Sequence, residues 1–283
     1  MSEAQRPPSI LPAPEPPAPP EAVRMIATDL DGTLLRSDGS LAPRVRAVLL
    51  AAQEAGIEVV PATGRPRMVT GDVIAELPFV HHWVFANGSV TWHAGRAELI
   101  RGFWLDPAEV RHLIGAVRRV LPDAGFAVEF EDDVAYEPGF ERVVPQMPAG
   151  APTASLVDAV DRRVQKLLVF SPERTVDELY QAVASVVDGE AVPTYSGLSF
   201  IELSAGLVTK ATALGHLADD LGIAPAEVAA FGDNHNDVAM LAWAGRSYAM
   251  AHATDDARAA ATEVIGSNDD DAVAGVIERL LGL

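Results

Sequence analysis

Two short apolar segments, separated by one segment of helical length, constrain the fold of this chain more than any other feature. Residues 23–29 and 57–62 are mainly apolar over the length of a strand, and each is followed by a glycine-containing turn. Strands buried on both faces of a parallel sheet have this pattern. Between them, residues 42–55 carry apolar side chains on one helical face, with Ser40 as a candidate N-cap and Gly56 at the end. Strand, helix and strand with short links form a right-handed parallel crossover.

The last third of the chain repeats this alternation of strands and helices. Helices are predicted at residues 66–77, 210–221, 237–244, 255–261 and 271–283, and strands at 83–85, 227–231 and 247–250. Both ends of the chain therefore predict one α/β domain, a Rossmann-like core with a doubly wound parallel sheet, formed by residues 23–93 and 197–283.

The middle of the chain has a different pattern. Helices are predicted at residues 107–121 and 175–187, and strands at 127–130, 134–136, 164–170 and 192–195. Strand pairs separated by single helices predict a smaller α+β domain, inserted at residues 94–196. Residues 1–22 are crowded with proline, so we expect a disordered tail, which could dock a proline-recognising partner but is more simply inert.

Composition excludes several classes of function. The chain of 283 residues has a formal net charge of −19, which argues against nucleic acid or an anionic membrane as its main partner. No apolar run reaches the roughly 20 residues of a membrane helix, and cysteine is absent, so disulfides and thiol chemistry are excluded. We expect a soluble, cytoplasmic protein that is a monomer or a small homo-oligomer.

The candidate functional residues follow predicted strands or begin a predicted helix. These segments are Asp29-Leu30-Asp31-Gly32-Thr33, Thr63-Gly64-Arg65, Lys210, and Gly232-Asp233-Asn234-His235-Asn236-Asp237. Ligands bind beyond the carboxyl ends of parallel strands, so we expect these segments to meet at one edge of the sheet. Clustered carboxylates without thiols favour a hard cation such as Mg²⁺, and Thr63, Gly64 and Lys210 can hold phosphate oxygens. Together they predict phosphoryl transfer.

The same segments resemble the four motifs of the haloacid dehalogenase (HAD) superfamily, and specifically its Cof-type phosphatases of sugars and small molecules. The motifs are Asp29-Leu30-Asp31-Gly32-Thr33-Leu34; Thr63-Gly64-Arg65, with Asn87-Gly88 after it; Lys210, preceded by Ser199-Phe200-Ile201-Glu202; and Gly232 to Asp237, followed by Ala239-Met240-Leu241. The likeness extends over residues 23–283, and it implies that the inserted domain is a cap that closes over the active site.

The resemblance also implies a role for each residue. Asp29 would attack phosphorus and form an aspartyl phosphate, and Asp31 would protonate the leaving oxygen and later deprotonate the attacking water. Mg²⁺ would be held by Asp29, the main-chain carbonyl of Asp31 and Asp233, with Asp237 binding directly or through water. The transferred phosphoryl group would be bound by Thr63, Gly64 and Lys210, with Asn236 supporting Lys210 or the phosphate and Arg65 a candidate for reaching the substrate.

Two positions depart from the family pattern. Ala251-His252-Ala253 and Asp271-Ala272-Val273 stand where members often have Gly-Asn-Ala and Asp-Gly-Val, which puts the local loop geometry in doubt. The predicted function is Mg²⁺-dependent hydrolysis of the phosphate monoester of a small metabolite, such as a sugar phosphate. A phosphotransferase or mutase, a non-catalytic sensor of phosphorylated metabolites, and a dinucleotide-binding oxidoreductase are the alternatives. The last lacks its Gly-x-Gly-x-x-Gly turn.

Several other residues have a simpler structural interpretation. Lys166, one of only two lysines in the chain, begins an apolar strand and is interpreted as structural. A salt bridge at a helix edge is as good an interpretation of Arg65 as substrate contact. His235 is expected to face solvent, and Asp269 to Asp271 are expected to form the N-cap and first turn of the last helix.

Overall fold

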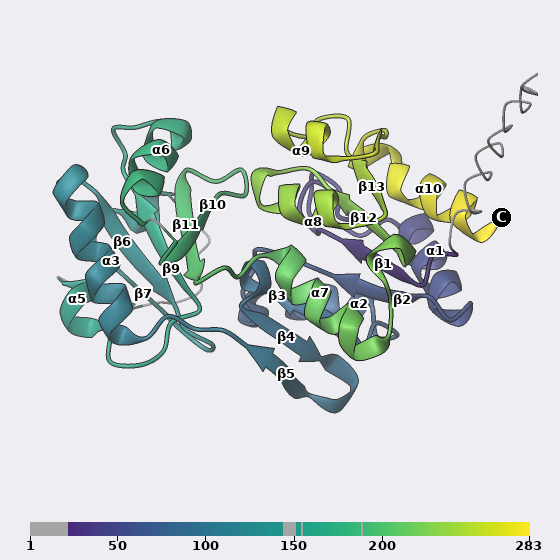
Figure 1. The fold of residues 1–283 in the computed structure, drawn as a ribbon, viewed down its shortest axis with the longest axis horizontal. Helices are drawn as coiled ribbons and strands as arrows, with labels where there is room; N and C mark the ends of the chain where they lie inside the picture. The colour runs from purple at the N-terminus through teal and green to yellow at the C-terminus, as the bar shows by residue number, and fades with distance from the viewer. Residues whose placement is uncertain (1–21, 144–150, 154, 188) are drawn as a thin grey trace, which may run out of the picture.

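A parallel five-stranded sheet forms the larger of two lobes. The structure, a computed structural model, describes residues 22–143, 151–153, 155–187 and 189–283. The sheet has the order β14-β13-β12-β1-β2, and all of its neighbours are parallel (Figure 1). Its strands are β1 (Met25–Thr28), β2 (Glu58–Pro61), β12 (Val228–Gly232), β13 (Arg246–Ala249) and β14 (Glu263–Val264). The predicted doubly wound core is confirmed.

Six of the α-helices in the described residues belong to this lobe. They are α1 (Pro43–Glu54), α2 (Gly71–Glu76), α7 (Lys210–Leu221), α8 (Val238–Trp243), α9 (Asp255–Ala260) and α10 (Ala272–Leu281). Ser40 is not the N-cap of α1, since its hydroxyl donates to Asp38 and Ala42 holds the cap position. The helix expected at residues 66–77 is a 3-10 turn, Arg67–Val69, followed by the short α2.

The acidic run before α10 does not form the first turn of that helix. A 3-10 turn, Asn268–Asp270, and a left-handed Asp271 (φ 55°) precede it. Asp269 accepts hydrogen bonds from the backbone amide and hydroxyl of Ser37, and Asp271 pairs with Arg36 at 2.8 Å. Asp271 thus stands at the predicted N-cap position of α10, but its side chain makes no cap hydrogen bond, and the acidic side chains hold the loop that follows the first motif.

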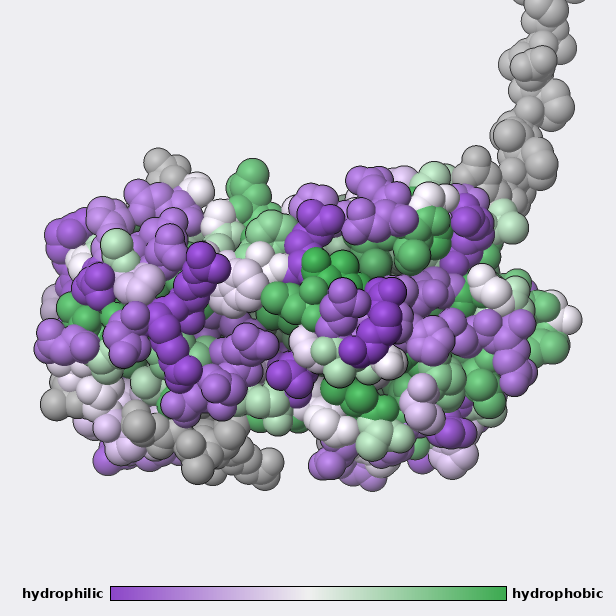
Figure 2. All heavy atoms as spheres, turned by 90° about the horizontal axis from the view of Figure 1, so that it is seen from below, coloured by the Kyte–Doolittle hydropathy of each residue, from purple (hydrophilic) through white to green (hydrophobic). Residues whose placement is uncertain are grey.

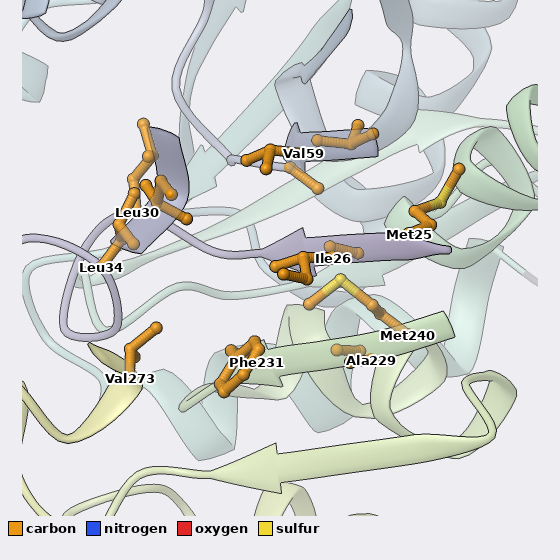
Figure 3. Packing of buried hydrophobic residues seen from close by; sticks show 14 of the residues in the cluster. Met25, Ile26, Leu30, Leu34, Val59, Ala229, Phe231, Met240 and Val273 are labelled. Carbon is orange, nitrogen blue, oxygen red and sulfur yellow. The ribbon is translucent and has the colours of Figure 1, made fainter. Parts of the chain in front are cut away.

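Apolar side chains fill the space between the sheet and its helices. Met25 and Ile26 of β1, and Ala229 and Phe231 of β12, are completely buried and belong to one core cluster that also includes Met240 of α8 (Figure 3). Burial of both faces explains why these strands are continuously apolar in sequence.

A small antiparallel sheet continues this lobe beyond β2 (Figure 1). Its strands are β3 (His82–Phe85), β4 (Val90–His93) and β5 (Glu98–Gly102), paired in the order β3-β4-β5. A parallel bridge between Ala62 and Val84 joins β3 to the end of β2. The chain then enters the second lobe, shown beside the first in Figure 1.

The second lobe is the predicted α+β cap. Its six-stranded sheet has the order β10-β11-β9-β6-β7-β8 and is antiparallel except between β7 and β8. Its strands are β6 (Gly125–Glu129), β7 (Val134–Tyr136), β8 (Ala151–Pro152), β9 (Lys166–Phe170), β10 (Ala191–Thr194) and β11 (Phe200–Ala205), and its helices are α3 (Pro107–Val120), α4 (Phe140–Val143), α5 (Leu156–Ala159) and α6 (Val176–Val187).

Strand β11 belongs to the cap sheet, which moves the boundary between cap and core along the chain. This strand pairs with β9 and β10 inside the cap sheet, although the expected boundary at residue 196 would assign it to the core. We therefore propose that the cap ends after Ala205 and that the core resumes near Lys210. Residues 1–21 of the proline-rich tail lie outside the described residues.

The surface is mainly hydrophilic on the face that Figure 2 shows, where apolar areas are interspersed among polar side chains on both lobes. This agrees with a chain of net charge −19. Among the described helices, none is both long and apolar enough to cross a membrane.

Candidate active site

The first motif forms a tight loop directly after β1. The amide of Asp29 donates to the carbonyl of Phe231 at 2.9 Å, which continues the pairing of β1 with β12 up to the carboxylate. Gly32 has a φ of +78°, and a Cβ atom there would lie 2.6 Å from the Asp233 carboxylate. Glycine is therefore required for the first and fourth motifs to approach each other.

Three carboxylates from two of the motifs meet at this edge of the sheet. Asp29, Asp233 and Asp237 are buried, and each offers an oxygen within 4.8 Å of the other two. Thr33 orients Asp233 by donating its hydroxyl to Oδ1 at 3.0 Å. Asp237 Oδ2 accepts the amides of Asp233 and Asn234, at 3.0 and 3.1 Å, which fixes the fourth-motif loop.

Lys210 lies beneath this cluster at the start of α7. Its ammonium group is fully buried and donates to Asp29 Oδ1 at 2.5 Å and Asp237 Oδ1 at 2.7 Å. The Thr209 side chain caps the helix by accepting from the Thr212 amide. The backbone at Thr209 also packs closely on Gly88, where a Cβ atom would lie 2.3 Å from the Thr209 carbonyl oxygen. These contacts fix the end of the helix that carries the lysine.

The three buried carboxylates carry more negative charge than the single ammonium group of Lys210 can balance. Burial raises the pKa of Asp29 well above its usual value, and the neighbouring carboxylates Asp237, Asp233 and Asp31 raise it further, against the lowering effect of Lys210. Burial and the charge of Asp237 also raise the pKa of Asp233, to about 6. For Lys210, the two carboxylates outweigh burial and raise its pKa above the usual range. A buried cluster of this kind favours a bound cation.

The second motif follows β2 at the same edge of the sheet, where Gly64 and Arg65 line a cavity. The buried Thr63 hydroxyl oxygen accepts the Arg65 amide at 3.0 Å. The Arg65 guanidinium forms a two-pronged ion pair with Asp31, and its Nε lies 2.7 Å from Asp31 Oδ2. Of the two interpretations of Arg65, the structure shows a salt bridge, although its partner is a predicted catalytic residue at the cavity wall.

Asn236 is held by Asn87, which follows the second motif in sequence and for which no contact was predicted. Its Nδ2 donates to Asn87 Oδ1 at 3.0 Å, and Asn87 Nδ2 donates to Glu202 Oε2 at 2.8 Å. Asn87 is in the left-handed region, with φ 56°, which asparagine tolerates better than most residues. The side-chain amide of Asn236 is therefore directed to Asn87 and not to Lys210, and a supporting role toward the phosphate stays a prediction.

A cavity of about 570 Å³ lies between the two lobes above these residues. The core contributes Asp29, Asp31, Gly64, Arg65, Asp233 and Asn236, and the cap contributes Glu129, Val134, Lys166, Leu168, Phe200 and Glu202. Predicted site residues of the core therefore line one side of the cavity, and residues of the cap sheet line the other.

Three polar residues of the cap sheet were missed as site residues. Lys166 is buried, and its ammonium group contacts Glu202 at 2.5 Å and Glu129 at 3.2 Å. Its interpretation as a purely structural residue is therefore too narrow, because it lines the cavity. The scarcity of lysine was the available signal, since both lysines of the chain lie in buried ion clusters at this site.

Two histidines of the core have defined contacts near the site. His235 is not free in solvent: its ring stacks on Tyr195 at 4.7 Å and meets the edge of Tyr180 at 4.9 Å, both in the cap. His252, at one of the departures from the family pattern, has Nε2 2.9 Å from the Gly32 carbonyl and 3.9 Å from Asp233. It therefore borders the first and fourth motifs.

Comparison with known proteins identifies the family of the chain. Residues 26–277 match the profile of the haloacid dehalogenase-like hydrolase family. The chain is 29% identical over 292 residues to the 5-amino-6-(5-phospho-D-ribitylamino)uracil phosphatase YwtE of Bacillus subtilis, covering 92% of this chain and 98% of the relative. It is 27% identical over 270 residues to the pyridoxal phosphate phosphatase YbhA of Escherichia coli, covering 90% and 97%.

A solved structure has the same fold. The crystal structure of SMU.1108c from Streptococcus mutans superposes with a TM-score of 0.83 and 27% sequence identity, covering 93% of this chain and all of that one. The family profile spans both halves of the core and the cap between them. The chain therefore belongs to the haloacid dehalogenase-like hydrolase family, and it is a phosphatase.

Proposed function

We propose that this phosphatase hydrolyses the phosphate monoester of a small metabolite, with Mg²⁺ as cofactor and an aspartyl phosphate at Asp29 as intermediate. The observation that carries the proposal is the position of Asp29. Its carboxylate borders the cavity, one oxygen is held by the buried Lys210, and two further carboxylates lie within 4.8 Å. A fixed carboxylate beside a cation site is suited to attack phosphorus.

The donor set fits a magnesium ion. The oxygens are hard ligands, and burial together with the neighbouring carboxylates raises the pKa values of Asp29 and Asp233. Asp237 is less suited to direct binding, because Oδ1 accepts from Lys210 and Oδ2 from two backbone amides. We therefore assign Asp29, Asp233 and the carbonyl of Asp31 as ligands, with Asp237 holding the others in place. When bound, the ion would offset the charge of these carboxylates and of the phosphate.

The reaction would proceed in two displacements. An Asp29 carboxylate oxygen attacks phosphorus as the bond to the leaving oxygen breaks, and Asp31 donates a proton to that oxygen. Water then attacks the aspartyl phosphate while Asp31 takes its proton, which releases inorganic phosphate, frees the Asp29 carboxylate and returns Asp31 to its protonated form. Thr63 and Lys210 would hold the phosphoryl oxygens in both steps, since Thr63 lies in the second motif at this edge of the sheet and Lys210, at the start of α7, contacts Asp29.

The substrate is proposed only as a class. Both walls of the cavity carry polar side chains, among them Glu129, Lys166 and Glu202 from the cap, which suits a small polar leaving group such as a sugar. The relatives named for a ribitylamino-uracil phosphate and for pyridoxal phosphate support a phosphorylated small molecule. A phosphotransferase or mutase that uses the same aspartate is the second candidate. Product analysis with and without an added sugar acceptor would separate the two.

The proposed function predicts metal dependence. Chelation with EDTA is expected to remove activity against a panel of phosphate monoesters, because the clustered carboxylates would then repel the phosphate. Mg²⁺ should restore activity, and Ca²⁺ should inhibit, because its coordination is looser and larger. Full activity in excess chelator would contradict the assigned site.

The raised pKa of Asp233 predicts that magnesium binding depends on pH. Its carboxyl, with a pKa of about 6 in the folded protein, must lose its proton to bind a cation. In the metal-free protein, the folded state keeps this proton where the unfolded chain has released it, so the group's contribution to stability falls as pH rises through about 4 to 6. Mg²⁺ should therefore raise the melting temperature clearly at about pH 7.5 and much less at about pH 5. An equal increase at both values would show that Asp233 is not a ligand.

A further inference from the structure

Lys166 connects the cap to the loop proposed to bind phosphate. It lies on β9 directly opposite Glu129 of β6 and diagonally across from Glu202 of β11, so all three side chains lie on one face of the cap sheet. Lys166 and Glu202 are 1% and 2% exposed, and Glu129 is 6% exposed. The two carboxylates outweigh burial and raise the pKa of Lys166, so the ammonium group stays charged.

The third partner of this ammonium group belongs to the core. Lys166 Nζ donates to the Gly64 carbonyl oxygen at 2.8 Å. That carbonyl and the Arg65 amide are parts of one planar peptide unit, and in a trans peptide they point in opposite directions. The Arg65 amide donates to Thr63 Oγ1 at 3.0 Å. The peptide is thus held by the cap at its oxygen and by Thr63 at its amide.

This arrangement determines how the Thr63 hydroxyl can act. A hydroxyl oxygen has one proton to donate and two lone pairs to accept with. Because one lone pair receives the Arg65 amide, the peptide orients the hydroxyl, whose proton is left for an external acceptor. We propose that Lys166 is a positioning residue for phosphoryl transfer, which aligns Thr63 with the phosphoryl group through the Gly64–Arg65 peptide. This inference rests on the proposed role of Thr63 in binding phosphate.

A second connection from the same cluster reaches the fourth motif. Glu202 accepts from Lys166 through Oε1 and from Asn87 through Oε2, and Asn87 in turn accepts from Asn236. A Cβ atom at Gly64 would lie 3.1 Å from Asn87 Oδ1, so the two connections run side by side. The loops of the second and fourth motifs are thus both hydrogen-bonded to the cap sheet, and these bonds require the cap to lie against the core.

A double-mutant cycle between Lys166 and Thr63 tests the inference. The two side chains act through an intervening peptide, so a purely structural Lys166 would give independent effects. With p-nitrophenyl phosphate as substrate, Thr63→Val is expected to lower kcat about 10²-fold, on the scale of one preorganised donor. Lys166→Met should lower kcat about tenfold in the wild-type background and less than about twofold in the Thr63→Val background. Lys166→Arg, which keeps a donor for Gly64, should recover part of the loss.

Arg118→Met is the matched control. It also removes a cap cation that faces a buried carboxylate, since Arg118 pairs with Glu137 at 2.5 Å, and its guanidinium lies over the ring of Phe126, so both partners belong to the cap. It should lower the melting temperature and leave kcat unchanged in both backgrounds. If Lys166→Met does not fold, the cycle is run with Glu129→Gln/Lys166→Met, which leaves fewer unpaired carboxylates.

Two outcomes would overturn the inference, and they are distinguishable. If Lys166→Met lowers kcat by the same factor in both backgrounds, Lys166 does not act through Thr63, and the proposed function is unaffected. If Thr63→Val alone leaves kcat unchanged, Thr63 does not bind the phosphoryl group, and that part of the proposed function fails together with the inference.

Discussion

Asp29→Asn is expected to abolish phosphatase activity while the protein remains folded. The amide has the shape of the carboxylate and can still accept from Lys210, but it cannot attack phosphorus. Loss of a nucleophile lowers kcat by about 10⁴-fold or more. Because the substitution also removes one charge from a buried acidic cluster, the melting temperature should not fall. Steady-state kinetics together with circular dichroism measure both quantities.

Asp31→Asn is the matched variant for this experiment. It lies two residues away, and its side chain borders the same cavity, but it keeps the proposed nucleophile. Turnover should be slowed severely, because neither the leaving oxygen nor the attacking water exchanges a proton with residue 31. An Asp29→Asn protein that turned over at the wild-type rate would rule out the covalent mechanism.

Lys210→Ala is expected to have the second largest effect. The lysine is completely buried between Asp29 and Asp237, in a protein whose net charge of −19 repels a phosphate dianion. Its removal should lower kcat/KM by about 10²-fold or more. It leaves two buried carboxylates without their cation, which costs about 3–5 kcal/mol of folding free energy. Lys210→Arg should also be poor, since the guanidinium fork is larger than the ammonium group.

The control for Lys210 must lie away from both lysine clusters. Lys166 is unsuitable, because it lines the cavity and contacts Gly64. Arg44 pairs with Glu278 on the exposed surface of the core, and Arg44→Met should leave kcat/KM unchanged. If Lys210→Ala hydrolysed the substrate as well as wild type, the phosphate must be bound by other residues.

The sequence predicted the core well because its signals are local. Continuous apolar runs such as that of β12 end at the residues that carry the chemistry, and parallel strands place their carboxyl ends at one edge. That is enough to bring Asp29 and Asp233 together without knowledge of side-chain contacts. The match of the whole core and cap to the family confirms the resemblance inferred from the four motifs.

The contacts between the lobes could not be predicted in the same way. Glu129, Lys166 and Glu202 lie on three strands of an antiparallel sheet, and their meeting depends on register and on how the sheet faces the core. A charged residue in an apolar strand indicates only that a partner exists. His235 was assigned to solvent for the same reason, since its aromatic partners come from the distant cap segments around Tyr180 and Tyr195.

Detection of the phosphorylated enzyme tests the central claim most directly. Asp31→Asn protein is mixed with a substrate identified in the phosphate-ester panel, quenched in acid, digested and mapped by mass spectrometry. The account predicts one added phosphoryl group on the peptide that contains Asp29, and none when Asp29→Asn is combined with Asp31→Asn. A phosphoryl group on another residue, or turnover by Asp31→Asn with no phosphorylated peptide at any time, would contradict the account.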